Sequence, residues 1–245
     1  MEDKLSFRLA EYLFRNAYPV YKILYRNFKN RQDAEEISYL KKEIKKGDIV
    51  LDIGANIGFY ATIISDLVGE NGKVYCFEPD NKNYSYLQKT TSGLKNVETV
   101  NAAIADKKGE LEIFTSHRLN VDHRMYKPEQ YDSSYIVPAI SIDEYLGSNL
   151  KVNFIKIDIQ GFELSAFKGM QKTLQFNKGI KILTEFWPHG LQSAGTSAEE
   201  LLDYMSSMGF NAYQNKNNQF IPLNKENIEA IGNGENDYCN VVFRN

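Results

Sequence analysis

Three acidic residues, Asp52, Glu78 and Asp106, each lie at or just beyond the end of a short apolar run. Each run is about five residues long and is rich in Val, Ile and Phe, which is typical of buried strands. Ligands of open parallel sheets bind beyond the carboxyl ends of the strands. We therefore expect the three carboxylates to converge on one small-molecule pocket.

The turn after the first run, Asp52-Ile-Gly-Ala-Asn-Ile-Gly58, narrows the choice of ligand. A dinucleotide would require G-x-G-x-x-G, and the acid beside this turn would repel a pyrophosphate. Asp52 suits a cationic group, Glu78 a ribose diol and Asp106 an adenine amino group. S-adenosylmethionine (SAM) carries all three groups and no phosphate. For the glycine spacing taken alone, a plain strand-to-helix turn remains an alternative.

The sequence here resembles the FkbM-type class I SAM-dependent methyltransferases, over roughly residues 35–210. The resemblance is carried by five segments: Val50-Leu-Asp-Ile-Gly-Ala-Asn-Ile-Gly-Phe-Tyr60, Val74-Tyr-Cys-Phe-Glu-Pro-Asp80, Asn101-Ala-Ala-Ile-Ala-Asp106, Ile155-Lys-Ile-Asp-Ile-Gln-Gly-Phe-Glu163 and Glu185-Phe-Trp-Pro-His-Gly-Leu191. Its most distinctive element is D-x-x-G-x-E, present as Asp158, Gly161 and Glu163. Gln160 and Phe162 depart from the acidic and small residues common there, which puts the acceptor environment in doubt.

This resemblance implies SAM as cofactor and O-methylation of a hydroxyl on a saccharide or secondary-metabolite acceptor. The residues expected to bind the cofactor are Asp52, Gly54, Asn56, Gly58, Phe59, Glu78, Pro79, Ala105, Asp106 and Asp158. Three other functions stay open. An N-methyltransferase on a small molecule or peptide would need no strong base, a dinucleotide oxidoreductase lacks its glycine pattern, and a non-catalytic SAM-binding scaffold would keep only the fold.

Asp158, Glu185 and His189 are the candidate catalytic residues. A sugar hydroxyl is a poor nucleophile, so O-methylation benefits from a general base or a metal. The three side chains suit an acid/base cluster, or the ligand set of a divalent ion that nothing in their spacing demands. Asp158 is equally suited to capping the next helix, and Glu163 to its first turn or to bonding the Gly161 turn. Trp187 suits either sugar stacking or packing.

These residues must be positioned by alternating strands and helices. Strands are expected at 49–53, 73–77, 97–101, 154–158, 180–186, 211–223 and 237–243. Repeated strand–helix units indicate an α/β fold, a Rossmann-like, doubly wound, mostly parallel seven-stranded sheet. Helix starts are expected at Asp33 and Ser197, each with Glu three residues on as a capping box, and at Asp80. Residues 1–46 form an expected helical cap on a methyltransferase domain of residues 47–245, with Pro19 ending or kinking the first helix.

Residues 110–142 interrupt this alternation. Strand-like runs at 110–115 and 136–142 flank a polar loop that contains His117, His123 and Tyr135. Long loops in compact domains are usually functional or disordered. We expect this one to lie over the carboxyl ends of the strands and to contact the acceptor.

Composition limits the classes of protein to which this sequence can belong. In 245 residues the hydrophobic fraction is 42% and the charged fraction 25%, which excludes overall disorder. A net charge of −3 favours a small-molecule or glycan acceptor over nucleic acid, although residues 1–46 hold 11 basic and 7 acidic side chains. Two scattered cysteines and no long apolar stretch predict a cytoplasmic protein without membrane insertion, and a homodimer is compatible with the sequence.

Overall fold

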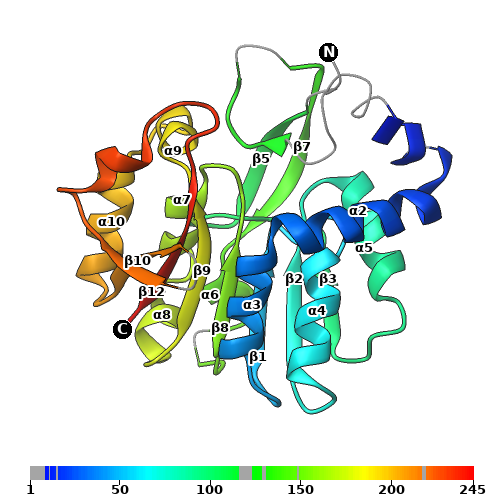
Figure 1. Ribbon diagram of the computed structural model, residues 1–245, viewed down its shortest axis with the longest axis horizontal. Helices are drawn as coiled ribbons and strands as arrows, with labels where there is room; N and C mark the ends of the chain where they lie inside the picture. Colours follow the sequence, from blue (N-terminus) through cyan, green and yellow to red (C-terminus); the bar gives the residue numbers. More distant parts are fainter. Residues whose placement is uncertain are drawn as a thin grey trace.

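The computed structural model describes residues 9–10, 12–14, 16–115, 123–128, 131–147, 149–216 and 219–245. Its centre is a sheet whose strands lie in the order β11-β10-β12-β9-β8-β1-β2-β3 (Figure 1). The strands are β1 (Ile49–Ile53), β2 (Lys73–Phe77), β3 (Val97–Val100), β8 (Phe154–Ile157), β9 (Lys181–Phe186), β10 (Asn211–Lys216), β11 (Gln219–Leu223) and β12 (Cys239–Arg244).

The five strands from β3 to β9 are parallel, and β12 joins β9 in the antiparallel direction. The chain winds outward from β1 to β3 on one side and from β8 to β9 on the other. The strand order therefore reverses between β1 and β8, which is where an open sheet forms a ligand crevice.

The α/β fold is confirmed, but the strand number of the main sheet is eight rather than seven. Residues 211–223 were expected as one closing strand. They form the antiparallel pair β10 and β11, in which Lys216 lies opposite Gln219. Two residues, Asn217 and Asn218, separate the paired strands in the sequence, and asparagine is a residue type that favours turns.

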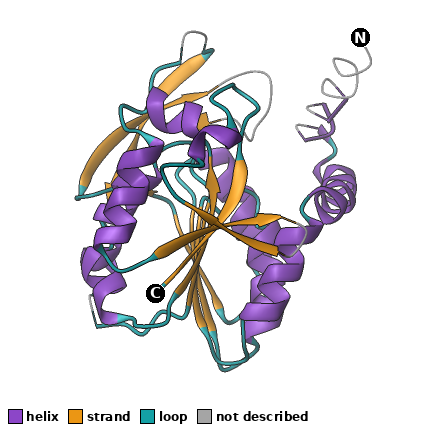
Figure 2. Ribbon diagram, turned by 60° about the vertical axis from the view of Figure 1, so that its left-hand side comes forward, coloured by secondary structure: helices purple, strands orange, loops and turns teal. Residues whose placement is uncertain are grey.

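Helices cover both faces of this sheet, which Figure 2 shows nearly edge-on. They are α2 (Tyr18–Gln32), α3 (Ala34–Glu43), α4 (Phe59–Val68), α5 (Asn81–Thr91), α6 (Ile142–Tyr145), α7 (Glu163–Lys168), α8 (Gln171–Phe176), α9 (Pro188–Ser193), α10 (Ala198–Ser207) and a 3₁₀ turn, Ile228–Ile231. Alternate side chains of each strand face opposite layers, so Leu51 and Ile155 pack in one apolar cluster while Val50 and Phe154 pack in the other.

The three predicted helix starts are observed, with Asp33, Asp80 and Ser197 at the N-caps, but one of the two predicted capping boxes is absent. Asp80 accepts a hydrogen bond from the Asn83 amide, and Ser197 with Glu200 forms a capping box. The capping box predicted at Asp33 is wrong, because the Asp33 carboxylate makes no cap bond. It accepts instead from the Tyr60 hydroxyl at 2.6 Å and pairs with Lys29.

Two further helix predictions are corrected. The chain leaves the helical conformation at Ala17, and Pro19 lies in the first turn of α2, where its missing N–H costs nothing. The single helix expected after β8 is divided into α7 and α8 around Gly169. A Cβ on Gly169 would lie 1.9 Å from the Ala105 carbonyl oxygen, so the chain at Gly169 passes too close to the Ala105 backbone for any side chain.

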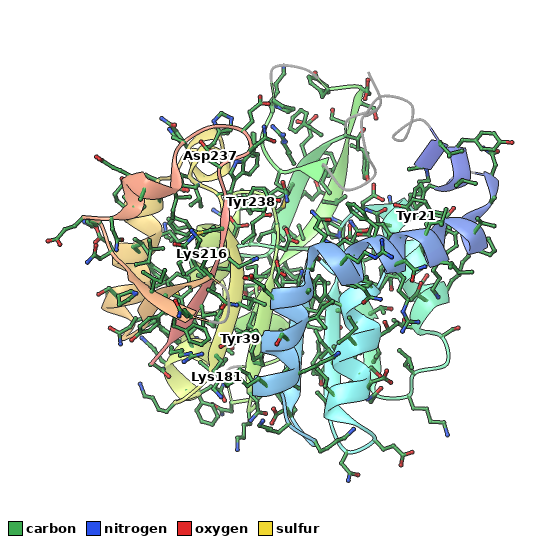
Figure 3. All side chains as sticks on the ribbon, in the orientation of Figure 1. Tyr21, Tyr39, Lys181, Lys216, Asp237 and Tyr238 are labelled. Carbon is green, nitrogen blue, oxygen red and sulfur yellow. The ribbon has the colours of Figure 1, made fainter. Side chains whose placement is uncertain are left out.

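The α3 helix belongs to the layer that covers the sheet. Its Tyr39 and Leu40 are buried in the same cluster as Val50 of β1, and Lys181 of β9 pairs with its Glu43 at 2.5 Å. Figure 3 labels Tyr39 and Lys181. The division of the chain at residue 46 stays a prediction.

Four strands between residues 103 and 140 form a second, smaller sheet in the order β4-β7-β5-β6. Its strands are β4 (Ala103–Ile104), β5 (Gly109–Thr115), β6 (His123–Arg124) and β7 (Ser133–Ile140). The two expected strands are thus present, and they pair with each other in the antiparallel direction. The hairpin rises above the main sheet in Figure 1.

Candidate active site

A cavity of about 1220 Å³ lies beyond the carboxyl ends of β1, β2, β8 and β9. Its lining combines residues from those strand ends with residues from α2, α3 and the small sheet. Of the sequence-predicted site residues, those that line it are Gly54, Asn56, Phe59, Glu78, Pro79, Asp158 and Glu185. Tyr21 of α2 and Tyr238, before β12, also line it and are labelled in Figure 3.

The turn after β1 is shaped by close backbone contacts. Gly54 has φ +81°, and a Cβ there would lie 2.0 Å from the Asp158 carbonyl oxygen. Asn56, also with positive φ, donates its amide to Glu78 at 2.8 Å. The turn after β1, the end of β2 and the turn after β8 are therefore held together at the cavity.

Glu78 is almost fully buried and its carboxyl group accepts the amides of Asn56 and Asp80. Burial raises its pKa to about 8, against the lowering effect of these two hydrogen bonds. A carboxylate has about four lone-pair sites, so two backbone amides leave capacity for two more donors. This capacity suits a ribose diol, as the sequence predicted.

Asp52 is completely buried and is absent from the cavity lining. Neither of its carboxylate oxygens has a hydrogen-bond partner in the described part of the chain. Its nearest cation is Lys156 of β8, whose Nζ lies 3.9 Å from Oδ1. Burial raises the pKa of Asp52 to about 6, a shift that Lys156 opposes.

Lys156 is a charged residue of the cavity lining that the sequence analysis missed. Its Nζ also lies 3.6 Å from Asp158 Oδ2 and 4.6 Å from the centre of the Tyr60 ring. Burial lowers its pKa, but Asp158 and Asp52 outweigh burial, so the pKa is raised and the side chain stays charged. Alternation along β8 was the available signal, because it places Lys156 beside Asp52 on a covered face.

Asp158 and Glu185 are brought together by Gln160. The Gln160 amide nitrogen donates to Asp158 at 3.3 Å and to Glu185 at 3.1 Å. The Glu185 pKa is raised well above its ordinary value, first by burial and then by the charge of Asp158. The Asp158 side chain, in contrast, is 37% exposed and opens toward the cavity.

The capping role considered for Asp158 is wrong, because α7 begins at Glu163 after an N-cap at Phe162. Glu163 does lie in the first turn of α7, where its carboxylate accepts the amides of Ile159 and Gly161. Burial raises its pKa to about 7. Glu163 therefore holds the turn that carries Asp158.

Other predicted residues lie apart from the cavity lining. Gly58, Ala105, Asp106 and His189 do not line it. Asp106 is exposed and its amide donates to the Ser165 hydroxyl, while the His189 ring lies 5.6 Å from the Trp187 ring. The cofactor and catalytic roles predicted for these residues stay predictions.

Trp187 lines the cavity and is 5% exposed, and the guanidinium of Arg124 lies 5.3 Å from its ring centre. Tyr135 donates its hydroxyl to Asp80, which ties the small sheet to the start of α5. His117 and the His123 side chain lie outside the described residues. No group of three His, Cys, Asp or Glu side chains suited to a metal was found among the residues that the structure describes.

Known proteins that this chain resembles are methyltransferases. Residues 52–212 match the family model of the methyltransferase FkbM domain. The hexuronic acid methyltransferase AglP of Haloferax volcanii is 26% identical over 179 residues, which cover 71% of this chain and 70% of that protein.

Solved structures resemble this chain at low sequence identity. A Clostridium thermocellum protein assigned as an rRNA methylase superposes with a TM-score of 0.55 at 14% identity, covering 86% of this chain and 95% of that chain. An Aquifex aeolicus SAM-dependent methyltransferase has a TM-score of 0.44 at 20% identity, covering 84% and 87%. The first of these likenesses supports the class I methyltransferase fold.

Proposed function

Because this chain belongs to the FkbM methyltransferase family, we propose that it methylates a hydroxyl oxygen of a saccharide, with SAM as methyl donor. Family membership makes it a SAM-dependent methyltransferase. The saccharide rests on its similarity to a hexuronic acid methyltransferase. Methylation of an oxygen is supported by one observation, the partly exposed carboxylate of Asp158 in the cavity. This carboxylate accepts a hydrogen bond from Gln160 and pairs with Lys156.

The residues present fit the cofactor. Glu78 keeps acceptor capacity for ribose hydroxyls, and the Gly54 turn brings backbone to the cavity without side-chain bulk. Asn56, Phe59 and Pro79 complete this side of the lining. When bound, SAM supplies a methyl group on a positively charged sulfur, open to attack by a nucleophile.

Asp158 is the proposed general base. An alcohol is hardly ionised near neutral pH, so a positioned carboxylate that takes its proton lowers the barrier. Gln160 fixes the orientation of the carboxylate through its hydrogen bond to Oδ1. The buried ammonium group of Lys156 lies 3.6 Å from Asp158 Oδ2, and this attraction helps to position the carboxylate in the cavity.

Glu185 supports this arrangement as a positioning residue. Its raised pKa favours the protonated form, in which it adds no second negative charge beside Asp158. Gln160 can then bridge the two carboxyl groups with one amide. His189 lies outside the cavity lining. The catalytic role predicted for it would require its side chain to turn toward Glu185 when the acceptor binds.

The experiment is methyl transfer from isotopically labelled SAM to a panel of acceptors, with the site of methylation found by mass spectrometry. The panel contains hexuronic acids, neutral hexoses, phenolic metabolites and amines. We expect methyl ethers of saccharides as products. Labelled amines, with no reaction on saccharides, would establish N-methylation instead, and SAM binding without any product would favour a scaffold.

The remaining expectations concern setting and partners. We propose that the acceptor is a small molecule or glycan, and that the protein works in the cytoplasm, as its cysteine usage suggests. Among the described residues, no helix is both long and apolar enough to cross a bilayer. A homodimer and the absence of a nucleic-acid partner stay predictions.

A further inference from the structure

One face of α2 is apolar and exposed. Val20, Ile23, Leu24 and Phe28 are 50%, 63%, 52% and 60% exposed. Residues at spacings of three, four and eight share one side of a helix. These four side chains are called the α2 apolar face below. Exposed apolar groups gathered on one surface commonly mark an interaction site.

The side of the same helix that carries Tyr21 and Tyr25 is packed against the protein. Tyr21 is 7% exposed and lies 5.0 Å from the Phe14 ring, while the Tyr25 ring lies 6.2 Å from the Phe59 ring. The exposed apolar side chains are therefore in excess of what the domain needs to hold α2. Figure 2 shows α2 on the outside of its helix layer.

The charge of α2 has a single sign. The helix contains Lys22, Arg26, Lys29 and Arg31, and no acidic residue. Lys29 pairs with Asp33. Rotations of 100° per residue place Arg31 within the apolar face and Arg26 about 60° beyond Ile23 at one border, whereas Lys22 lies on the opposite side of the helix. Arg26 and Arg31 are both exposed.

We propose that the α2 apolar face docks on an anionic membrane surface. An apolar stripe bordered by basic side chains is the pattern of interfacial helices, which insert aliphatic and aromatic groups among lipids while Lys and Arg meet anionic headgroups. With 15 residues and a rise of about 1.5 Å per residue, α2 is about 22 Å long, shorter than the roughly 30 Å of a hydrocarbon core. It therefore lies along the surface.

A second copy of this chain fits the face less well. In a two-fold symmetric dimer each patch meets itself, so the basic residues of α2 would face their own copies. α2 offers no acidic side chain to offset that repulsion. Anionic headgroups supply the complementary charge that a second copy lacks.

The face is continuous with the mouth of the cavity. Leu24, Phe28 and Arg31 also line the cavity described above. Docking through α2 consequently places the cavity entrance beside the bilayer surface. The inference itself does not depend on methyl transfer, because binding to lipid is measured without any acceptor.

The test is co-sedimentation of the full chain with vesicles made of equal parts phosphatidylglycerol and phosphatidylcholine, compared with vesicles of phosphatidylcholine alone. We expect binding to the anionic vesicles that weakens as salt rises. The double variant Val20→Glu/Ile23→Glu, outside the cavity lining, should weaken binding at least about tenfold. Arg26→Gln and Arg31→Gln should each weaken it about fivefold.

Phe176→Glu is the matched control, since Phe176 is 53% exposed on the distant α8. It should bind vesicles as the unmodified chain does, and calorimetric binding of SAM shows that each variant is folded. Failure of the unmodified chain to bind anionic vesicles would overturn the proposal, as would full binding by the double variant. A dimer in solution that the double variant dissociates would assign the face to self-association.

Discussion

At the scale of single residues, Asp158 carries the proposed chemistry. Asp158→Asn keeps the oxygen that accepts from Gln160 but removes the charge that takes a proton. We expect kcat to fall by about 10²–10⁴-fold while the Kd of SAM stays nearly unchanged. Steady-state kinetics and calorimetry measure both. Asp203→Asn, which removes an exposed ion pair with Lys225, is the control. Near-normal turnover by Asp158→Asn would refute base catalysis.

Glu78 is the residue expected to hold the ribose of SAM. Glu78→Ala should weaken the binding of SAM and S-adenosylhomocysteine by about 1–3 kcal/mol through the loss of charge-assisted hydrogen bonds. Because its pKa is raised to about 8, calorimetry belongs at a pH of about 9, where the carboxyl group is ionised. Unchanged affinity would remove Glu78 from the cofactor site.

Glu163 links stability to pH. Its pKa is raised from 4.5 to about 7 by burial, so the folded state binds more protons than the unfolded state between these values. Its contribution to the free energy of unfolding is therefore fully present below about pH 4.5 and is lost as pH rises through about 7, by roughly 3 kcal/mol. Glu163→Gln should flatten this part of the profile of denaturation midpoint against pH. An identical slope in the variant would contradict the assignment.

At the scale of elements, the β1–α4 turn must touch the turn after β8. Gly54→Ala would place a Cβ 2.0 Å from the Asp158 carbonyl oxygen at φ +81°. Gly209→Ala is a matched control, because φ is +86° there but nothing lies within 4 Å. The control should lose about 1–2 kcal/mol of unfolding free energy, the cost of the left-handed backbone, and Gly54→Ala distinctly more. Equal losses of unfolding free energy in the two variants, measured with denaturant, would mean that the close contact with Asp158 does not affect stability.

Local sequence patterns predicted the strands and turns that hold the site. Features that depend on contacts between distant parts of the chain were not predicted. The apolar runs and glycine turns placed β1, β2, β8 and β9 within about one residue. The reversal between β10 and β11 has a local signal in Asn217 and Asn218, whereas the pairing of β10 with β12 is a long-range contact that no local pattern encodes. Asp33 matches a capping pattern in the sequence, yet its carboxylate bonds to Tyr60 and Lys29, which the folded structure brings close to it. Lys156 was missed because the alternation along β8 shows that its side chain is covered, but the two carboxylates beside it come from the pairing of β8 with β1 and from the turn after β8.

At the scale of the whole molecule, the small sheet brings Arg124 and Met125 to the cavity from outside the main sheet. Thr115 and Ser133 lie opposite each other in the β5–β7 pair, so an Asn-Gly turn can replace residues 116–132 and close a tight hairpin. We expect this variant to bind SAM normally and to lose turnover, because the sequence predicts that the replaced segment contacts the acceptor. Normal acceptor kinetics in the folded variant would refute that role.

The most direct test of the whole account is a crystal structure of the protein with S-adenosylhomocysteine. The account predicts that the ribose hydroxyls lie within hydrogen-bonding distance of Glu78, that the amino-acid portion follows the Gly54 turn, and that the sulfur faces the side of the cavity that holds Asp158. Density for the ligand away from the carboxyl ends of β1, β2 and β8, or with its sulfur turned away from Asp158, would contradict it.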